Sequence, residues 1–137
     1  MNTHEPEAST LEQVIESLPD EKSKVTAEIM RRFNEAFLRH DPSALESLVA
    51  ENCVIEKVSP APDGDRCVGR EACVALWTAI ATEPGTHFDL EEVFAARDRA
   101  TIRWRYSSGE GRSVRGVNLM RVSGGVIVEA MGYVKGG

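Results

Sequence analysis

Apolar residues recur at helical spacing through the first part of the chain and alternate with polar residues through the second. The pattern predicts a short helix over Leu11–Leu18 and a long one from about Glu21 to Arg39. Asp41-Pro42, an N-cap followed by proline at the first helical position, predicts a third, short helix. A further helix opens at Gly69 and ends before Pro84-Gly85.

Strands are expected once among the helices and then in an uninterrupted series. Residues 53–59 form the first predicted strand, followed by a turn-rich loop. From His87 onward, alternation predicts strands over 87–96, 99–107, 112–122 and 126–135, joined by hairpin connections. Helices followed by an antiparallel meander indicate an α+β fold, a bent sheet with helices on one face. Residues 1–21 are expected to form an N-terminal arm with a short helix, and residues 22–137 a single domain.

Alternation also sorts each predicted strand into two faces. One face is apolar or small and is expected to meet the helices. It includes Asn118, a buried amide that needs a hydrogen-bonding partner, with the small Ala130 and Gly132 beside it. This combination predicts a pocket, or else an Asn118 that only satisfies a loop backbone or a bulge.

The opposite face mixes apolar residues with charged ones. This mixture favours a homodimer interface, and the alternative is a solvated face with incidental ion pairs. Its charged members are Arg103, Arg105, Arg115, Arg121 and Glu129.

Composition narrows the functional classes. The 137 residues carry 16 Lys and Arg against 22 Asp and Glu, a net charge of −6, which suits one acidic domain. The acidic excess disfavours nucleic acid and anionic membranes as partners, and no apolar run approaches the roughly 20 residues that span a bilayer. The start of the sequence lacks the pattern of a signal peptide. Cys53, Cys67 and Cys73 lack metal-ligand spacing, so we expect free thiols in the cytoplasm, with no metal and no cofactor.

A longer set of features agrees in order and spacing with one known superfamily. Its first members are Phe33, Phe37, His40-Asp41, Val54-Ile55-Glu56 and Gly69-Arg70-Glu71. Its later members are Trp77, Arg103-Trp104-Arg105, Arg115-Gly116-Val117-Asn118, the run from Gly125 to Glu129, and Tyr133. Over about residues 22 to 135 the chain resembles the nuclear transport factor 2-like superfamily, in its SnoaL-like branch of polyketide cyclases, limonene-epoxide hydrolases and ketosteroid isomerases.

The resemblance implies a cone: a curved, mostly antiparallel sheet with N-terminal helices packed on its concave face around a cavity. It also implies dimerisation through the outer face. The catalytic groups of the known branches are mostly replaced. Where ketosteroid isomerases have a tyrosine, a base and an oxyanion-stabilising acid, this chain has Phe33, Lys57 and Asn118, and a second tyrosine matches Trp77. The carboxylates of epoxide hydrolases are also missing, since their positions read Ile102-Arg103-Trp104 and Gly132.

Three hypotheses follow. In the first, a small enzyme binds an apolar metabolite and catalyses an acid–base isomerisation, cyclisation or hydration. Asn118 then polarises a carbonyl, and Glu56 or Lys57 moves the proton, whichever of the two neighbours points inward, with Glu92 as a third candidate. In the second the cavity binds without catalysis, and in the third the chain is a dimeric interaction module. The expected pocket residues are Phe33, Phe37, Trp77, Trp104, Tyr106, Met120 and Gly132.

Overall fold

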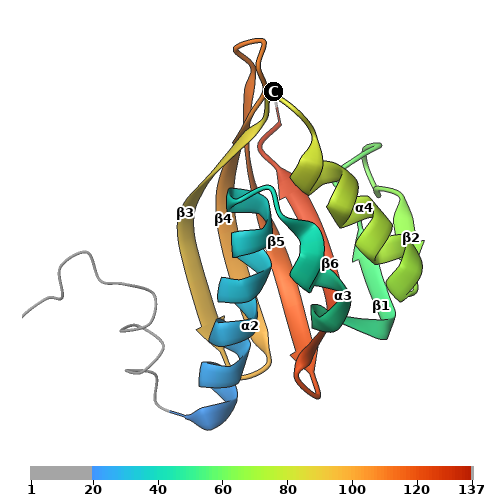
Figure 1. Cartoon of the computed structure of the whole chain (residues 1–137), viewed down its shortest axis with the longest axis vertical. Helices are drawn as coiled ribbons and strands as arrows, with labels where there is room; N and C mark the ends of the chain where they lie inside the picture. The colour runs from blue at the N-terminus through green and yellow to red at the C-terminus, as the bar shows by residue number, and fades with distance from the viewer. Residues whose placement is uncertain (1–19, 137) are drawn as a thin grey trace, which may run out of the picture.

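A curved sheet of six strands forms the frame of the fold, and the helices cover one of its faces (Figure 1). The computed structural model describes residues 20–136, so the predicted helix at 11–18 lies outside the described residues. The helices are α2 (Glu21–Leu38), a 3-10 turn (Pro42–Ala44), α3 (Leu45–Leu48) and α4 (Arg70–Thr82). The strands are β1 (Val49–Glu56), β2 (Arg66–Val68), β3 (His87–Ala96), β4 (Arg99–Ser107), β5 (Ser113–Ser123) and β6 (Val126–Val134).

The strand order is β2-β1-β6-β5-β4-β3. Strands β3 to β6 form the antiparallel meander that the alternation predicts. Strand β1 joins the meander by pairing parallel to β6, and it runs from Val49 to Glu56, earlier than the expected 53–59. Strand β2, which pairs with β1 and lies between the expected loop and the helix at Gly69, was not predicted because three residues are too few to show alternation.

Two β-bulges correct the predicted faces. A bulge between Leu90 and Glu92 shifts β3 against β4, so Glu92 pairs with Arg103 on the outer face and Phe94 is 62% exposed. Glu92 is therefore wrong as an inward candidate, because the extra residue of a bulge reverses the alternation beyond it. A second irregularity, between Arg121 and Val122, places Ile127 in the core, whereas strict alternation along 126–135 puts Ile127 on the same outer face as Glu129.

Hydrogen bonds near the N-terminus of helix α2 fix its position relative to the β3–β4 turn of the sheet. Asp20 caps the helix by accepting a hydrogen bond from the backbone N–H of Ser23 at 2.7 Å. The hydroxyl oxygen of Ser23 accepts from the backbone N–H of Arg97 at 2.7 Å, and the hydroxyl of Thr26 donates to the carbonyl of Arg97. Arg97 lies in the β3–β4 turn with φ of 56°, so both of its backbone groups are satisfied by α2.

We expect Thr26→Val to lower the free energy of unfolding by about 1–3 kcal/mol, because the bond from the buried Thr26 hydroxyl to the Arg97 carbonyl is lost while the side-chain volume is kept. Thr82→Val is the matched control, since the exposed Thr82 hydroxyl bonds only to Thr78 of its own helix. Urea unfolding of both variants measures the difference. Equal stability of the two variants would show that the contact does not hold α2 in place.

Candidate functional site

A cavity of about 380 Å³ lies between helices α2 and α4 and the concave face of the sheet. Its wall is mainly apolar and aromatic. Six of the seven residues expected in the pocket line it: Phe33, Phe37, Trp77, Trp104, Tyr106 and Gly132. The seventh, Met120, is 2% exposed and packs in the core beside the cavity instead of lining it.

A continuous series of aromatic rings joins the helices to the sheet around this cavity. Phe33 of α2 contacts Trp77 of α4 edge-on, with ring centroids 4.8 Å apart. Phe37, one turn further along α2, contacts Phe88 of β3 at 5.6 Å. Phe88 in turn lies 4.8 Å from Tyr106 and 5.9 Å from Trp104 on β4. The contacts of Phe33 with Trp77, of Phe37 with Phe88 and of Phe88 with Trp104 are edge-to-face, a geometry that stabilises an aromatic pair by about 0.5–1.5 kcal/mol beyond its buried area.

Asn118 of β5 is oriented by its neighbour Trp104. The indole Nε1–H of Trp104 donates to Oδ1 of Asn118 at 3.2 Å. An indole nitrogen is only a donor, so the amide atom facing it is the oxygen. The Nδ2 group of Asn118 then has no partner among residues 20–136, and Asn118 lines the cavity. This arrangement gives the cavity a fixed hydrogen-bond donor.

Small residues make room for this arrangement. Gly116 pairs with Trp104 across β4 and β5, and a Cβ at Gly116 would lie 2.5 Å from the indole ring. A Cβ at Gly132 would lie 2.9 Å from Val58 and 3.4 Å from Oδ1 of Asn118. The chain directly after β1 is therefore adjacent to Asn118, separated only by the missing side chain of Gly132.

Glu56 and Lys57 both border the cavity and are half-buried. Their side chains have no hydrogen bond or ion pair within the described part of the chain. Ile55 pairs with Ala130, and both side chains are buried on the inner face of the sheet. Glu56 pairs with Met131, the next residue along β6, which faces the opposite side. Because paired residues share a face, the register assigns the Glu56 side chain to the outer face. β1 ends at Glu56, and both Lys57 and Val58, the two residues that follow it, line the cavity.

Asn34 was missed by the sequence analysis. It lies on α2 beside Phe33, lines the cavity and is 5% exposed. Its Nδ2 is buried without a hydrogen-bonding partner among the described residues. The signal was present in the sequence, because Asn34 lies four residues after Met30 and three before Phe37 on the apolar face of the helix.

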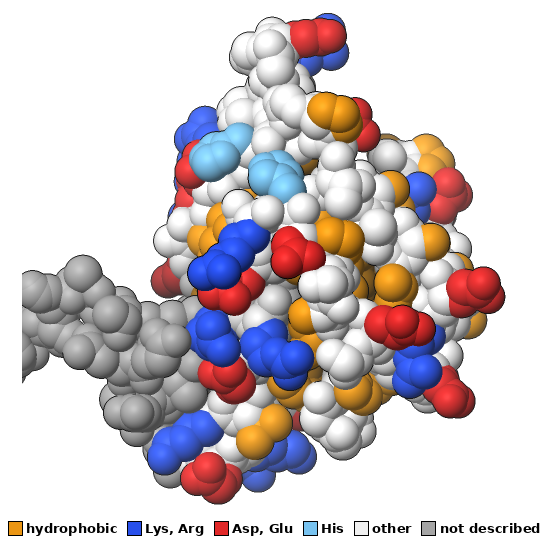
Figure 2. Space-filling model, viewed as in Figure 1, with side chains coloured by type: hydrophobic (Ala, Val, Ile, Leu, Met, Phe, Trp, Pro, Cys, Tyr) orange, Lys and Arg blue, Asp and Glu red, His pale blue; other side chains and the backbone are white. Residues whose placement is uncertain are grey.

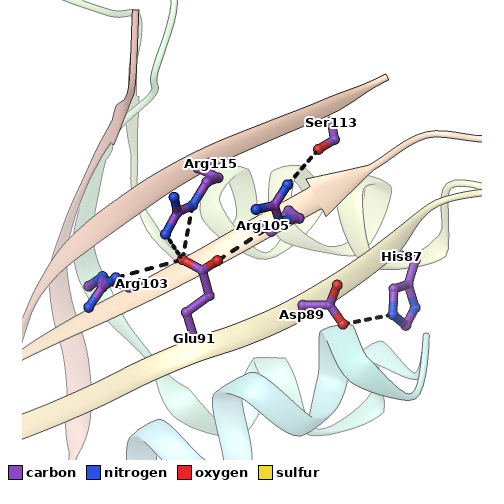
Figure 3. Close-up of polar contacts among 7 residues, drawn as sticks. All are labelled: His87, Asp89, Glu91, Arg103, Arg105, Ser113 and Arg115. Carbon is purple, nitrogen blue, oxygen red and sulfur yellow. Dashed lines mark hydrogen bonds and ion pairs between the residues drawn. The ribbon is translucent and has the colours of Figure 1, made fainter. Parts of the chain in front are cut away.

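The outer face of the sheet carries a cluster of ion pairs centred on Glu91 (Figure 3). Arg115 approaches the Glu91 carboxylate to 2.9 Å, while Arg103 and Arg105 lie at 3.9 Å. The hydrogen bond from Arg115 holds the pKa of Glu91 below its ordinary value. Elsewhere on the same face Arg121 pairs with Glu129 at 3.2 Å. The five charged residues assigned to this face from the sequence therefore all take part in pairs.

The cysteines are free thiols in the structure. Burial raises the pKa of Cys53 to about 12 and also raises the pKa of Cys73, which suppresses the reactive thiolate form. Among residues 20–136 no group of His, Cys, Asp and Glu is arranged to hold a metal ion.

On the helix-covered face, basic and acidic side chains are interspersed, with hydrophobic ones visible between them (Figure 2). This face therefore presents no broad patch of a single charge. None of the described helices is long and apolar enough to cross a membrane.

We expect Gly116→Ala to displace the Trp104 indole and to lower the free energy of unfolding by about 1–3 kcal/mol, as overpacking does. The new methyl group meets the indole on one side and the backbone carbonyl of Tyr133 at 2.6 Å on the other. Gly136→Ala, with no atom within 4 Å of the new Cβ, is the control. Chemical unfolding followed by tryptophan fluorescence measures both effects, and an unchanged Gly116→Ala spectrum and stability would contradict the packing described here.

Comparison with known proteins agrees with this architecture. The family model for the SnoaL-like domain matches residues 30–130. A crystal structure of an NTF2-like protein of unknown function from Mesorhizobium loti superimposes with a TM-score of 0.85 at 70% sequence identity, covering 87% of this chain and 98% of that chain. A search of curated proteins found no match.

More distant structures share the fold. A steroid delta-isomerase from Pseudomonas aeruginosa has a TM-score of 0.71 at 20% identity, covering 88% of this chain and 85% of that chain. A putative SnoaL-like polyketide cyclase from Jannaschia sp. CCS1 also has a TM-score of 0.71, at 12% identity, covering 87% of this chain and 91% of that chain. At such identities the likeness concerns architecture and not chemistry. On the strength of the family match and the shared fold, the chain belongs to the SnoaL-like family of NTF2-like proteins.

Proposed function

We propose that this protein binds a small, mostly apolar molecule that carries a carbonyl group, and that it catalyses proton transfer beside that carbonyl. The observation that carries the proposal is the free Nδ2 group of Asn118, which Trp104 orients inside an apolar cavity. The cavity volume of about 380 Å³ lies within the range of small-molecule sites. Two proteins of the same fold are named as a steroid delta-isomerase and a putative polyketide cyclase, and these names also indicate a mostly apolar carbonyl compound as substrate.

The chemistry follows from the position of the amide. When a base removes a proton from the carbon next to a carbonyl, the electron pair of the broken C–H bond moves onto the carbonyl oxygen. A fixed donor stabilises this developing charge, most strongly where water is excluded. Return of the proton to another carbon gives an isomerisation, and the same transfers serve a cyclisation or a hydration.

Two groups are available to carry the proton. Lys57 is the first candidate, because it lines the cavity directly after β1, whereas the register assigns the Glu56 side chain to the outer face. Glu56 is the second, since it also borders the cavity and its carboxylate has no partner among the described residues. Either group is a suitable general acid or base when it reaches the substrate.

Deuterium exchange tests this function without knowledge of the natural substrate. In D₂O the protein is expected to accelerate exchange of the protons beside the carbonyl of decalone, a bicyclic ketone. Asn118→Leu should slow the protein-dependent exchange by about a hundredfold or more, as loss of an oxyanion donor does. Mass spectrometry of the ketone measures the rate, and Asn52→Leu, an exposed position on β1, is the control.

Lys57→Met and Glu56→Gln identify the proton carrier, because only the variant that lacks it loses exchange. If decalone raises the melting temperature of the wild type but no variant alters a background exchange rate, the chain is a binding protein without this catalysis. Absence of both binding and exchange would refute the proposed function.

We also propose that the outer face of the sheet binds a second copy of the chain. Leu119 and Tyr133 are 44% and 50% exposed there, in the middle of the sheet and beside the paired arginines and glutamates. An apolar centre with charges of both signs around it suits a symmetric interface, in which each patch meets its own copy.

Sedimentation velocity is expected to show a dimer for the wild type and a monomer for Leu119→Glu, because the new carboxylate would be buried against apolar surface. Val68→Glu is the matched control, since Val68 is 66% exposed on β2 at the edge of the sheet remote from this face's centre. A monomeric wild type at tens of micromolar would refute the dimer.

A further inference from the structure

An aromatic side chain lies exposed on the outer face of the sheet, at the edge of the sheet. Phe94 of β3 is 62% exposed, and no other aromatic side chain of residues 20–136 is as exposed. Strand β3 is the last strand of the sheet, so one side of its ten-residue backbone lacks a neighbouring strand. Long edge strands with exposed apolar side chains tend to pair with other chains, and native proteins commonly cover them with a helix or a loop.

The positive charge next to Phe94 is only partly matched. Arg99 of β4 lies directly opposite Arg121 of β5, and like charges in this arrangement repel each other. Arg121 has a partner in Glu129 at 3.2 Å, but the side chain of Arg99 forms no hydrogen bond or ion pair within the described part of the chain. Thr101, two residues after Arg99 on the same face, pairs with Phe94. Phe94, Arg99 and Thr101 together form the edge patch.

The described chain begins close to the edge patch. Residues 1–19 lie outside the described part of the structure. Helix α2 starts beside the β3–β4 turn (Figure 1), where side chains of its first two turns bond to the backbone of Arg97. Phe94 precedes Arg97 by three residues along a strand, a distance of about 10 Å. Eight residues in helical form span about 12 Å, so the segment before Asp20 is long enough to pass the β3 edge and reach Phe94.

The sequence of that segment is complementary to the edge patch in hydrophobicity and in charge. Apolar residues recur in it at the spacing of one helix face: Leu11, Val14, Ile15 and Leu18. Residues 1–19 also contain four glutamates and neither lysine nor arginine, so they carry four of the six net negative charges of the chain. Two of these glutamates, Glu12 and Glu16, lie between the apolar residues.

We propose that residues 11–18 bind to the edge patch of their own chain. The apolar residues of the segment contact the ring of Phe94, and Glu12 or Glu16 supplies the carboxylate that Arg99 lacks. Burial of the ring provides most of the stabilisation, because an exposed ion pair contributes little. Phe94 is two strands away from Leu119, so this segment and a second copy of the chain can occupy the outer face together.

Cross-linking between introduced cysteines tests the contact in the full-length chain. Ile15→Cys combined with Phe94→Cys is expected to form a disulfide within one chain under mild oxidation, seen as a faster-migrating monomer on a non-reducing gel and as a linked peptide by mass spectrometry. Ile15→Cys combined with Val68→Cys is the matched control, since Val68 is 66% exposed on β2, at the opposite edge of the sheet. Both proteins also carry Cys67→Ser, because the other two native thiols are buried.

Only one result of this experiment supports the proposal, a cross-link within one chain that forms with Phe94→Cys and not with Val68→Cys. A disulfide in both proteins, or in neither, would overturn it. A cross-link between two chains, seen as a band of twice the mass, would also overturn it, because the segment would then cover a second copy.

Hydrogen exchange gives a second readout that needs no introduced cysteine. The amides of residues 11–18 are expected to exchange at least about tenfold more slowly than in an unstructured peptide. Phe94→Ser should return them to the unstructured rate while β4 and β5 keep their own protection, because Phe94 is exposed. Arg99→Ser should reduce the protection about two- to fivefold, which corresponds to one exposed ion pair, and Val68→Ser should not change it. Unprotected amides in the wild type, or protection that persists in Phe94→Ser, would refute the contact.

Discussion

The hydrogen bond from Trp104 to Asn118 is the contact on which the site depends. Without it, the amide of Asn118 could turn and present either its oxygen or its nitrogen to the cavity. The contact itself requires an indole lying flat against the neighbouring strand, and only a glycine at position 116 leaves the space for that. A backbone feature of β5 thus fixes the polarity of the site, because it decides which end of an amide faces the ligand.

The cavity is maintained against the general tendency of protein interiors to fill. Gly132 and Ala130 leave space on the sheet, and the ring contacts from Trp77 through Phe33 and Phe37 to Phe88 hold the two layers apart. The unpaired Nδ2 of Asn34 adds a further cost. A fold that keeps both an open volume and an unpartnered buried amide is less stable than the same fold with a filled core, which is the usual relation between a binding site and stability.

The sequence predicted the parts of this architecture that depend on regular periodicity. The meander, helices α2 and α4 and most of the cavity wall follow from spacings of two and of three or four residues. The errors lie where one extra residue interrupts the period: the bulge at Leu90/Glu92 moved Glu92 and Phe94 outward, and the irregularity at Arg121/Val122 moved Ile127 inward. Asn34 was missed although its place on the apolar face of α2, between Met30 and Phe37, can be read from the sequence, whereas its lack of a partner is visible only in the structure.

The ion-pair cluster beside the bulge in β3 lies directly behind the cavity. Glu91 follows the inward Leu90 and therefore faces outward, where its carboxylate bridges β3 and β5 across β4 (Figure 3). Those three strands carry Phe88, Trp104 and Asn118 on their other side. Each exposed ion pair contributes less than about 1 kcal/mol, so the cluster adds little to global stability. Its effect is local, because the pairs of Glu91 with Arg103, Arg105 and Arg115 tie three neighbouring strands together behind the Trp104–Asn118 contact.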